Sequence, residues 1–225
     1  MSEKSKNSIV LFGARTPLIG DYVDSCLRLG LKVAAIINVD QRPDRLPDRS
    51  RLIAIDEVSG NQRTLPYVPA AFSPVRRRQL RELASVSGFE NPLALVDSSA
   101  VVAGTTAVGE GSYVNALTAV GSSSRIGQFV FINRSTNIGH HVMIGDYASI
   151  GPGVSITSSV LIGEGAMVGA GATLLPGVRI GAGAVVAAAT RVHTDVPDNT
   201  LAIGSALTLK PIREGSRIMD YSAQE

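Results

Sequence analysis

Aliphatic residues return at every sixth position through the second half of the chain. An α-helix buries residues at a spacing of three to four and a flat strand at a spacing of two, whereas six fits a short strand followed by a turn. The pattern therefore predicts a parallel coil of short strands and excludes a helical solenoid. Seventeen consecutive positions at this spacing are Val, Ile or Leu: Val96, Val102, Val108, Val114, Val120, Ile126, Ile132, Ile138, Ile144, Ile150, Ile156, Ile162, Val168, Leu174, Ile180, Val186 and Val192.

A second row of small residues accompanies the first, two positions before each aliphatic residue. From Ala94 to Thr190 these positions hold only Ala, Ser, Thr or Val, which suits inward-facing side chains in a narrow coil. Each fully buried aliphatic residue contributes roughly 1.5 to 3 kcal/mol, and every coil hydrogen-bonds only to its neighbours. The two rows together predict one continuous core along the axis of the coil.

This pattern resembles the hexapeptide-repeat acyltransferases. The resemblance implies a left-handed parallel β-helix of triangular section, with three hexads in each turn. Ordinary crossover connections are right-handed, so the hand follows from the resemblance alone. With about 18 residues in a coil, residues 18 positions apart are expected to lie directly above one another.

The first ninety residues alternate between short apolar runs and amphipathic segments. Strands are predicted at 8–13, 32–39, 52–55 and 65–70, and helices at 17–30 and 73–87. Pro17 suits the first helical position and Gly30 suits the C-terminal cap. The expected apolar face of the first helix consists of Ile19, Tyr22, Val23, Cys26 and Leu27.

This order of elements favours a small parallel sheet flanked by helices. We therefore predict three parts: an α/β, Rossmann-like domain at 1–92, a β-helix at 93–212, which the resemblance makes left-handed, and a C-terminal tail at 213–225. The charged segment 41–51 is expected to be an exposed loop.

The composition removes several classes of function. A net charge of only +2, with 4% aromatic residues and no long basic run, gives no support to a nucleic-acid surface. No segment has the roughly 18 apolar residues of a membrane span, and the first residues lack the apolar stretch of a secretory signal. We expect a cytoplasmic protein without membrane insertion. The single cysteine, Cys26, excludes an internal disulfide and is expected to pack in the core.

A small βαβ domain followed by a hexapeptide coil is similar to the bacterial acyltransferases that N-acetylate nucleotide-linked amino sugars, in the sialic acid O-acetyltransferase-like family. The resemblance covers nearly the whole chain. It implies acetyl-CoA as co-substrate, no metal, a role in polysaccharide biosynthesis, and a homotrimer with the active site between the coils of adjacent subunits.

The loop after the first strand departs from the family's Gly-Gly-His type, because this chain has Gly13, Ala14 and Arg15 there. A G-x-G-x-x-G fingerprint is also absent, since Arg15 and Leu18 occupy its second and third glycine positions. The backbone amides at the start of the helix, together with Arg15, would still suit a phosphate group. The alternative is that this loop only connects the strand to the helix. Asp40 resembles the family's acidic residue near the nucleotide; a solvated turn is its alternative.

Three arginines, Arg76, Arg77 and Arg78, lie in the first turn of the second predicted helix. Positive charge opposes the helix dipole at this end. A solvated helix face is expected, and a bound anion is the alternative.

The main candidate for chemistry is His140, two positions after the repeat residue Ile138. The resemblance implies that a histidine in this place is the general base toward the acceptor. The unperturbed pKa of a histidine side chain, near 6.5, suits it to accept a proton at neutral pH and return it later. His141 stands where the family often has an acidic residue, so it either replaces that partner or points outward.

The spacing of 18 places serines around this base. His140 is expected to lie between Ser122 and Ser158, and His141 below Ser159. The resemblance implies that the backbone N–H of Ser158 is an oxyanion donor and that Ser159 contacts the acyl-CoA. Loss of such a donor typically costs about 2.7 to 4 kcal/mol in catalysis.

Other positions are predicted to bind substrate or co-substrate. Asn115 and Asn133 either position the sugar or form an asparagine ladder, and Ser149 stands where the family often has a second histidine near the thioester. Beside the pantetheine arm, small side chains are expected at Gly169, Ala170, Gly181 and Ala182.

The exit from the coil, DVPDN at 195–199, resembles the family's exit motif, but the lysine that normally follows is missing. Lys210 is expected to replace it near the CoA phosphates, with Arg213 as the alternative. His193 is expected at the surface.

The leading prediction is an acetyl-CoA-dependent acyltransferase that acetylates the amino group of a nucleotide-linked amino sugar by direct displacement, with His140 as base. A sugar O-acetyltransferase and a catalytically silent β-helix scaffold are the alternatives. A metal-dependent hydratase on the same coil needs three histidine ligands on neighbouring faces, whereas His140 and His141 come from one corner.

Overall fold

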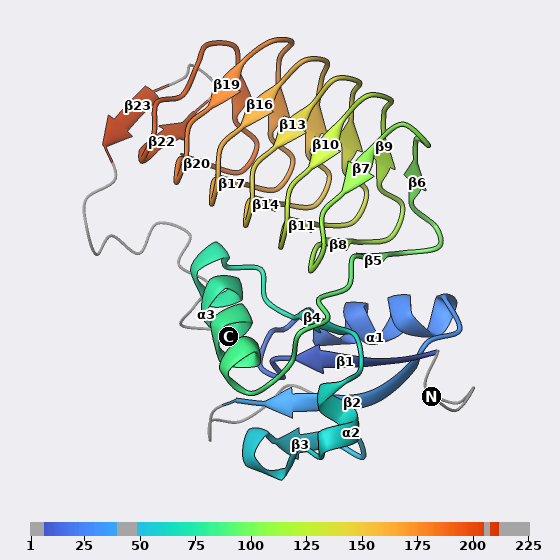
Figure 1. Cartoon of the computed structure of the whole chain (residues 1–225). Helices are drawn as coiled ribbons and strands as arrows, with labels where there is room; N and C mark the ends of the chain where they lie inside the picture. The colour runs from blue at the N-terminus through green and yellow to red at the C-terminus, as the bar shows by residue number, and fades with distance from the viewer. Residues whose placement is uncertain (1–6, 40–48, 205–207, 212–225) are drawn as a thin grey trace.

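The computed structural model describes residues 7–39, 49–204 and 208–211, which form a small α/β part packed on a long coil (Figure 1). The α/β part has a fully parallel sheet in the order β3-β2-β1-β4. Its elements are β1 (Ser8–Phe12), α1 (Ile19–Arg28), β2 (Lys32–Asn38), β3 (Leu52–Ala54), the 3-10 helix η2 (Ile55–Glu57), α2 (Gly60–Arg63), β4 (Tyr67–Pro69) and α3 (Pro74–Val86). The four predicted strands and both predicted helices are confirmed, whereas η2 and α2 were not predicted.

Helix α1 begins later than predicted, whereas Gly30 terminates it as expected. Pro17 and Leu18 form a turn in which Ile19 N donates to Thr16 O, so the helix begins two residues after Pro17. Its C-cap residue is Leu29, and Gly30 follows with φ +68°, in the left-handed conformation that ends many helices. Leu27, predicted on the buried face, is 59% exposed, and Ser25 is buried in its place.

Helix α3 begins as predicted. The Ser73 side chain accepts a hydrogen bond from Arg76 N, and Pro74 occupies the first turn. Leu80 and Ala84 of α3 pack on Val10, Phe12 and neighbouring residues of the sheet. The other sheet face, which includes Ile9 and Leu11, packs with α1 and the coil.

The coil has three faces, each a parallel sheet of two-residue strands stacked at the predicted spacing. The docked face, which contacts the α/β part, consists of β5 (Leu95–Val96), β8 (Tyr113–Val114), β11 (Phe131–Ile132), β14 (Ser149–Ile150), β17 (Met167–Val168), β20 (Val185–Val186) and β22 (Thr200–Ile203), extended by the antiparallel β23 (Thr208–Pro211). The second face consists of β6 (Val101–Val102), β9 (Ala119–Val120), β12 (Asn137–Ile138), β15 (Ser155–Ile156), β18 (Thr173–Leu174) and β21 (Arg191–Val192). The third face consists of β7 (Ala107–Val108), β10 (Arg125–Ile126), β13 (Met143–Ile144), β16 (Leu161–Ile162) and β19 (Arg179–Ile180).

The predicted aliphatic row and the small row before it form the core of the coil. From Val114 to Val192 the aliphatic residues of the row are at most 4% exposed and belong to one cluster with Val130, Ala148 and Val160 of the small row. The exit segment completes the stack, because the side chains of Asp195 and Asp198 accept hydrogen bonds from backbone amides one coil below.

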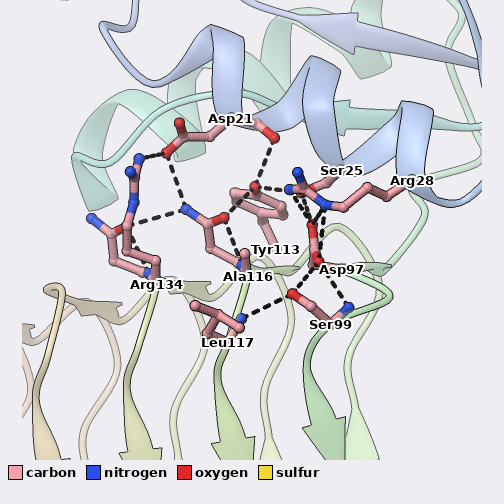
Figure 2. Close-up of polar contacts among 11 residues, drawn as sticks. Asp21, Ser25, Arg28, Asp97, Ser99, Tyr113, Ala116, Leu117 and Arg134 are labelled. Atoms are coloured by element: carbon pink, nitrogen blue, oxygen red, sulfur yellow. Dashed lines mark hydrogen bonds and ion pairs between the residues drawn. The ribbon is translucent and has the colours of Figure 1, made fainter.

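Helix α1 is fixed to the docked face by a buried polar network (Figure 2). Asp97, at the base of the coil, accepts hydrogen bonds from Arg28 Nη2 at 2.6 Å and from Ser25 Oγ at 2.5 Å. The backbone N–H and hydroxyl of Ser99 also donate to it. Burial raises the pKa of Asp97, but these hydrogen bonds outweigh burial and hold the pKa well below its usual range.

The other end of α1 is held in the same way. Asp21 accepts hydrogen bonds from Asn115 Nδ2 at 3.1 Å and from Arg134. Between the two ends, the ring of Tyr22 stacks on Tyr113 with centroids 4.0 Å apart. The helix is therefore attached to several successive coils (Figure 2).

The three arginines at the start of α3 were predicted to form a solvated helix face, and this prediction is wrong for Arg77. Arg77 is 1% exposed and donates to backbone carbonyls of both domains: Ala71 O, Phe72 O, Phe129 O, Tyr147 O and Ala148 O, at 2.5 to 2.9 Å. It also donates to Ser149 Oγ. Arg78 lies at the surface, where it pairs with Glu164 and covers the ring of Tyr147. One arginine thus joins the domains, and its neighbour supports the same contact from outside.

Candidate active site

The two adjacent histidines lie on the edge between the second and third faces, in the turn that joins β12 to β13. We term this the histidine edge; it comprises the turns 103–105, 121–123, 139–141, 157–159 and 175–177. In a triangular coil this edge is opposite the docked face. It is therefore the edge that the α/β part of the same chain does not cover.

Backbone hydrogen bonds align this turn with the turns above and below. His141 N donates to Ser122 O, and Ser159 N donates to His140 O, each at 3.0 Å. The strands before the turn pair Asn137 with Ala119 and with Ser155. The structure therefore places Ser122, His140 and Ser158 in one column, as the spacing of 18 predicts.

The amide of Ser158 is available at this column. Among the described residues, no acceptor is found for its N–H, whereas the N–H groups of Thr157 and Ser159 donate within the coil. The glycine below keeps the approach close: a Cβ on Gly139 would lie 2.9 Å from Ser158 N and 2.8 Å from the carbonyl carbon of Thr157. The lack of a side chain at Gly139 thus allows the coil that contains His140 to approach the coil that contains Ser158.

The histidines contact each other directly. His140 Nδ1 and His141 Nδ1 lie 2.9 Å apart, and the rings are nearly perpendicular at 88°. Both side chains lie at the surface, and the serines of the adjacent turns, Ser122 and Ser159, are exposed as well. His141 thus contacts His140, and its role as a partner in the reaction stays a prediction.

The loop predicted to bind nucleotide lies on the opposite side of the coil. Gly13 ends β1 with φ +115°, and a Cβ there would meet Leu80 at 2.9 Å and Ala70 O at 3.2 Å, so the position requires glycine. Ala14 is buried in the cluster that contains Tyr113 and Phe131 of the docked face. Within one chain the structure does not bring Gly13, Ala14 and Arg15 together with His140. Asp40 lies outside the described residues.

The paired asparagines form the ladder that the sequence allowed. Asn115 Nδ2 donates to Asn133 Oδ1 at 3.2 Å, and the two residues are 2% and 7% exposed. They lie on the edge between the docked and second faces, with α1 against them. The Asn115 amide also donates to Asp21 of α1, and Asn133 Oδ1 also accepts from Arg134 N, so substrate contact by these residues is not part of the site that the structure assembles.

Ser149 also lies away from the histidine edge. It is fully buried on the docked face, where its hydroxyl donates to Phe72 O at 2.6 Å and accepts from Arg77. His193 is exposed near the end of the coil, as predicted. Cys26 is fully buried, and burial raises its pKa to about 12, so it is an inert packing residue.

The coil sequence also matches a known family. The model described as bacterial transferase hexapeptide (six repeats) covers residues 123–158 and 159–194, which include both histidines and Ser158. The coil is that of a hexapeptide-repeat acyltransferase. The predicted fold class, an α/β Rossmann-like domain followed by a left-handed parallel β-helix, is confirmed with it.

Solved structures resemble this acyltransferase over most of its length. One is a mutant of perosamine N-acetyltransferase from Caulobacter crescentus in complex with CoA and GDP-perosamine, which is 28% identical to this chain. The match covers 91% of this chain and 96% of that chain, with a TM-score of 0.81. The acetyltransferase domain of PglB from Neisseria gonorrhoeae FA1090 in complex with acetyl coenzyme A is 23% identical, with coverages of 90% and 98% and a TM-score of 0.79, and shows the likeness of fold. No curated protein matches the sequence.

The residues predicted to contact the co-substrate are distributed over three edges of the acyltransferase coil. Ser159 lies on the histidine edge, Gly169 and Ala170 on the edge after the docked face, and Gly181 and Ala182 on the edge after the third face. One chain therefore does not bring them together. Lys210 lies in β23 and pairs with Leu201 through its backbone; its side chain and Arg213 lie outside the described part.

A groove on the third face was not predicted. It has a volume of about 320 Å³ and lies between the outward residues of the third face and the edge after that face, where Gly127, Gly145 and Gly163 line it. Met143 and Leu161 are 43% and 46% exposed along it, with Arg125 and Arg179 at its two ends. Apolar residues at outward positions of the third face, 18 positions apart, are the sequence signal that would have identified it.

The described residues of the acyltransferase also bear on metals and membranes. In the ranges 7–39, 49–204 and 208–211, no group of three or more His, Cys, Asp or Glu side chains could hold a metal ion. None of the helices in these ranges is long and apolar enough to span a membrane.

Proposed function

We propose that the protein transfers the acetyl group of acetyl-CoA to the amino group of a nucleotide-linked amino sugar, with His140 as general base. The observation that carries the proposal is the column on the histidine edge, where a surface imidazole lies one coil below the available N–H of Ser158. The likeness at 28% identity to an enzyme solved with CoA and GDP-perosamine supports this substrate class.

The proposed reaction is one displacement. The sugar amine attacks the thioester carbonyl carbon and forms a C–N bond, while His140 Nε2 takes the amine proton. The Ser158 N–H stabilises the negative charge that develops on the carbonyl oxygen. The C–S bond then breaks, and the leaving sulfur receives the proton from His140, so that an amide and a thiol are the products. Cys26 is in the other domain and buried, so no covalent enzyme intermediate is included.

The third-face groove suits the acyl donor. Met143 and Leu161 offer an apolar wall for a pantetheine arm, and Arg125 and Arg179 offer cations for phosphate groups. β13 lies between this groove and the turn that contains His141, so an arm that leaves the groove across β13 would bring its thioester to the histidine edge. Ser159 borders this position, in agreement with its predicted contact with acyl-CoA.

The acceptor site requires a second copy of the chain. The loop Gly13–Arg15 and His140 lie on opposite sides of one coil, so a sugar nucleotide held by this loop reaches the histidine edge of a neighbouring coil. A closed ring of three chains satisfies this arrangement for every site. We therefore propose the homotrimer that the family resemblance implies. A reducing, cytoplasmic location and a role in polysaccharide biosynthesis complete the proposal, in agreement with the single buried Cys26.

The proposal is tested by thiol release from acetyl-CoA in the presence of nucleotide-linked amino sugars, with GDP-perosamine as the first acceptor. Acceptor-dependent release together with an acetamido product is expected. Nucleotide diphosphates alone should raise the melting temperature. If no amino sugar stimulates thiol release while a sugar hydroxyl does, the enzyme is an O-acetyltransferase and the proposal is wrong in its acceptor.

The shared site has its own test, which uses mixed trimers. His140→Ala and Arg15→Glu are each expected to be inactive alone. Random co-assembly of the two variants should restore about a quarter of the wild-type sites, because half of the loops and half of the histidines are intact. Mixed trimers without activity would contradict a site built from two chains.

A further inference from the structure

The contact between the two histidines restricts their protons. The 2.9 Å separation of the two Nδ1 atoms is a hydrogen-bond distance, and such a bond contains one hydrogen. If both Nδ1 atoms carried a proton, or neither did, the contact would be repulsive. One neutral imidazole is therefore the Nδ1–H tautomer, and the other is the Nε2–H tautomer.

The backbone holds the pair in this contact. His141 has a φ of 57°, in the left-handed region, and its N–H is bound to Ser122 O, while the His140 carbonyl is bound to Ser159 N. Both residues are thus anchored to adjacent coils through their main chains. The perpendicular ring arrangement, with centroids 5.1 Å apart, leaves the contact to the nitrogen atoms and excludes ring stacking.

We propose that His141 is a positioning residue that accepts a hydrogen bond from His140 Nδ1–H at its own Nδ1, and thereby fixes His140 as the tautomer with a free lone pair on Nε2. This inference rests on the proposed function for its catalytic meaning, because only a free Nε2 can take the amine proton. The pair then presents two different groups: an acceptor at His140 Nε2 and a donor at His141 Nε2–H.

The arrangement differs from a histidine–carboxylate pair in its charge. The histidine pair is neutral before the reaction and carries one positive charge after His140 Nε2 has taken the amine proton. The hydrogen between the two Nδ1 atoms lets both rings share this charge, and return of the Nε2 proton to the leaving sulfur restores the neutral pair. No proton is gained or lost over the cycle.

The tautomers are directly measurable because the chain contains only three histidines, His140, His141 and His193. The probe is the side-chain ¹⁵N spectrum of histidine-labelled protein at about pH 8.5, where an ordinary histidine is neutral. His193→Gln removes the exposed third histidine and assists assignment. We expect the Nδ1–H tautomer at His140 and the Nε2–H tautomer at His141.

Two substitutions separate positioning from structure. His141→Asn keeps an acceptor, because the amide oxygen lies where Nδ1 was, and asparagine adopts positive φ readily. His141→Leu removes the acceptor but suits the backbone, since Leu117 occupies the equivalent turn position with a φ of 58°. The two variants should have similar melting temperatures.

We expect His140 to remain the Nδ1–H tautomer in His141→Asn and to lose that preference in His141→Leu. In acetyl transfer, kcat should fall about tenfold or more in His141→Leu, with KM for acetyl-CoA little changed, and His141→Asn should recover most of the loss. Averaged or Nε2–H tautomers at His140 in the wild type would overturn the proposal. Equal kcat in the two variants would overturn it as well. The spectra do not depend on turnover, so a failure of the proposed function leaves the tautomer test intact.

Discussion

Arg28 and Asp97, one in each domain, form an ion pair of 2.6 Å in which the Asp97 side chain is fully buried and the Arg28 side chain is 42% exposed. The pair closes a network that attaches α1 to the base of the coil (Figure 2). Because the proposed acceptor site uses the α/β domain of one chain and the coil of another, the orientation of these domains determines which atoms meet. The interface is therefore a part of the site's geometry.

Asp97→Asn is expected to lower the free energy of unfolding by about 2 to 3 kcal/mol at neutral pH. The folded pKa of Asp97 lies below its unfolded value, so its contribution is complete above about pH 4 and is lost as the pH falls through the folded pKa. The difference between wild type and Asp97→Asn should therefore shrink in acid. Chemical denaturation at several pH values measures it, with the exposed Asp24→Asn on the same helix as control. A difference that stays constant with pH would contradict the role of Asp97.

Adjacent arginines of α3 should differ sharply. Arg77→Met leaves several buried carbonyl oxygens without their donor and should lower the free energy of unfolding by about 3 to 5 kcal/mol. Arg78→Met removes an exposed ion pair and a ring contact, and should cost about 1 kcal/mol or less. Equal stability of the two variants in denaturant titrations would show that the buried hydrogen bonds do not hold the domains together.

Gly139→Ala is expected to reduce acetyl transfer. The added Cβ would crowd Thr157 and the Ser158 amide, so the coils must separate by a few tenths of an ångström where the oxyanion donor lies. A loss of about tenfold or more in kcat is expected. Gly104 lies on the same edge with open space around its Cβ position, and Gly104→Ala is the matched control. A Gly139→Ala enzyme with the kcat of the control would remove Ser158 N–H from the reaction.

The coil and its column of site residues follow from the sequence because both depend on a single repeat length. A residue at position n lies above the residue at n−18 whatever the side chains are, so the repeat alone aligns Ser122, His140 and Ser158. The direct Nδ1 contact of His140 with His141 depends on rotamers and on the left-handed backbone at His141, which the repeat does not specify.

The domain interface could not be predicted in the same way, because its polar residues are unremarkable in isolation. Arg77 was predicted on a solvated face and Ser25 was not placed on the apolar face of α1, yet each is buried through partners many residues away. One signal was present: most outward positions of the hexads on the docked face carry large apolar residues, such as Tyr113, Phe131 and Met167. Such side chains on the outside of a coil indicate a covered face.

The role of His140 is tested most directly by steady-state acetyl transfer in His140→Asn, which keeps a side chain of similar shape without a base. We expect kcat to fall by about 100-fold or more, with KM for acetyl-CoA changed little, because general-base catalysis contributes about 10² to 10⁴. The melting temperature should stay near that of the wild type, since the side chain lies at the surface. A His140→Asn enzyme with a kcat close to that of the wild type would contradict the proposed mechanism.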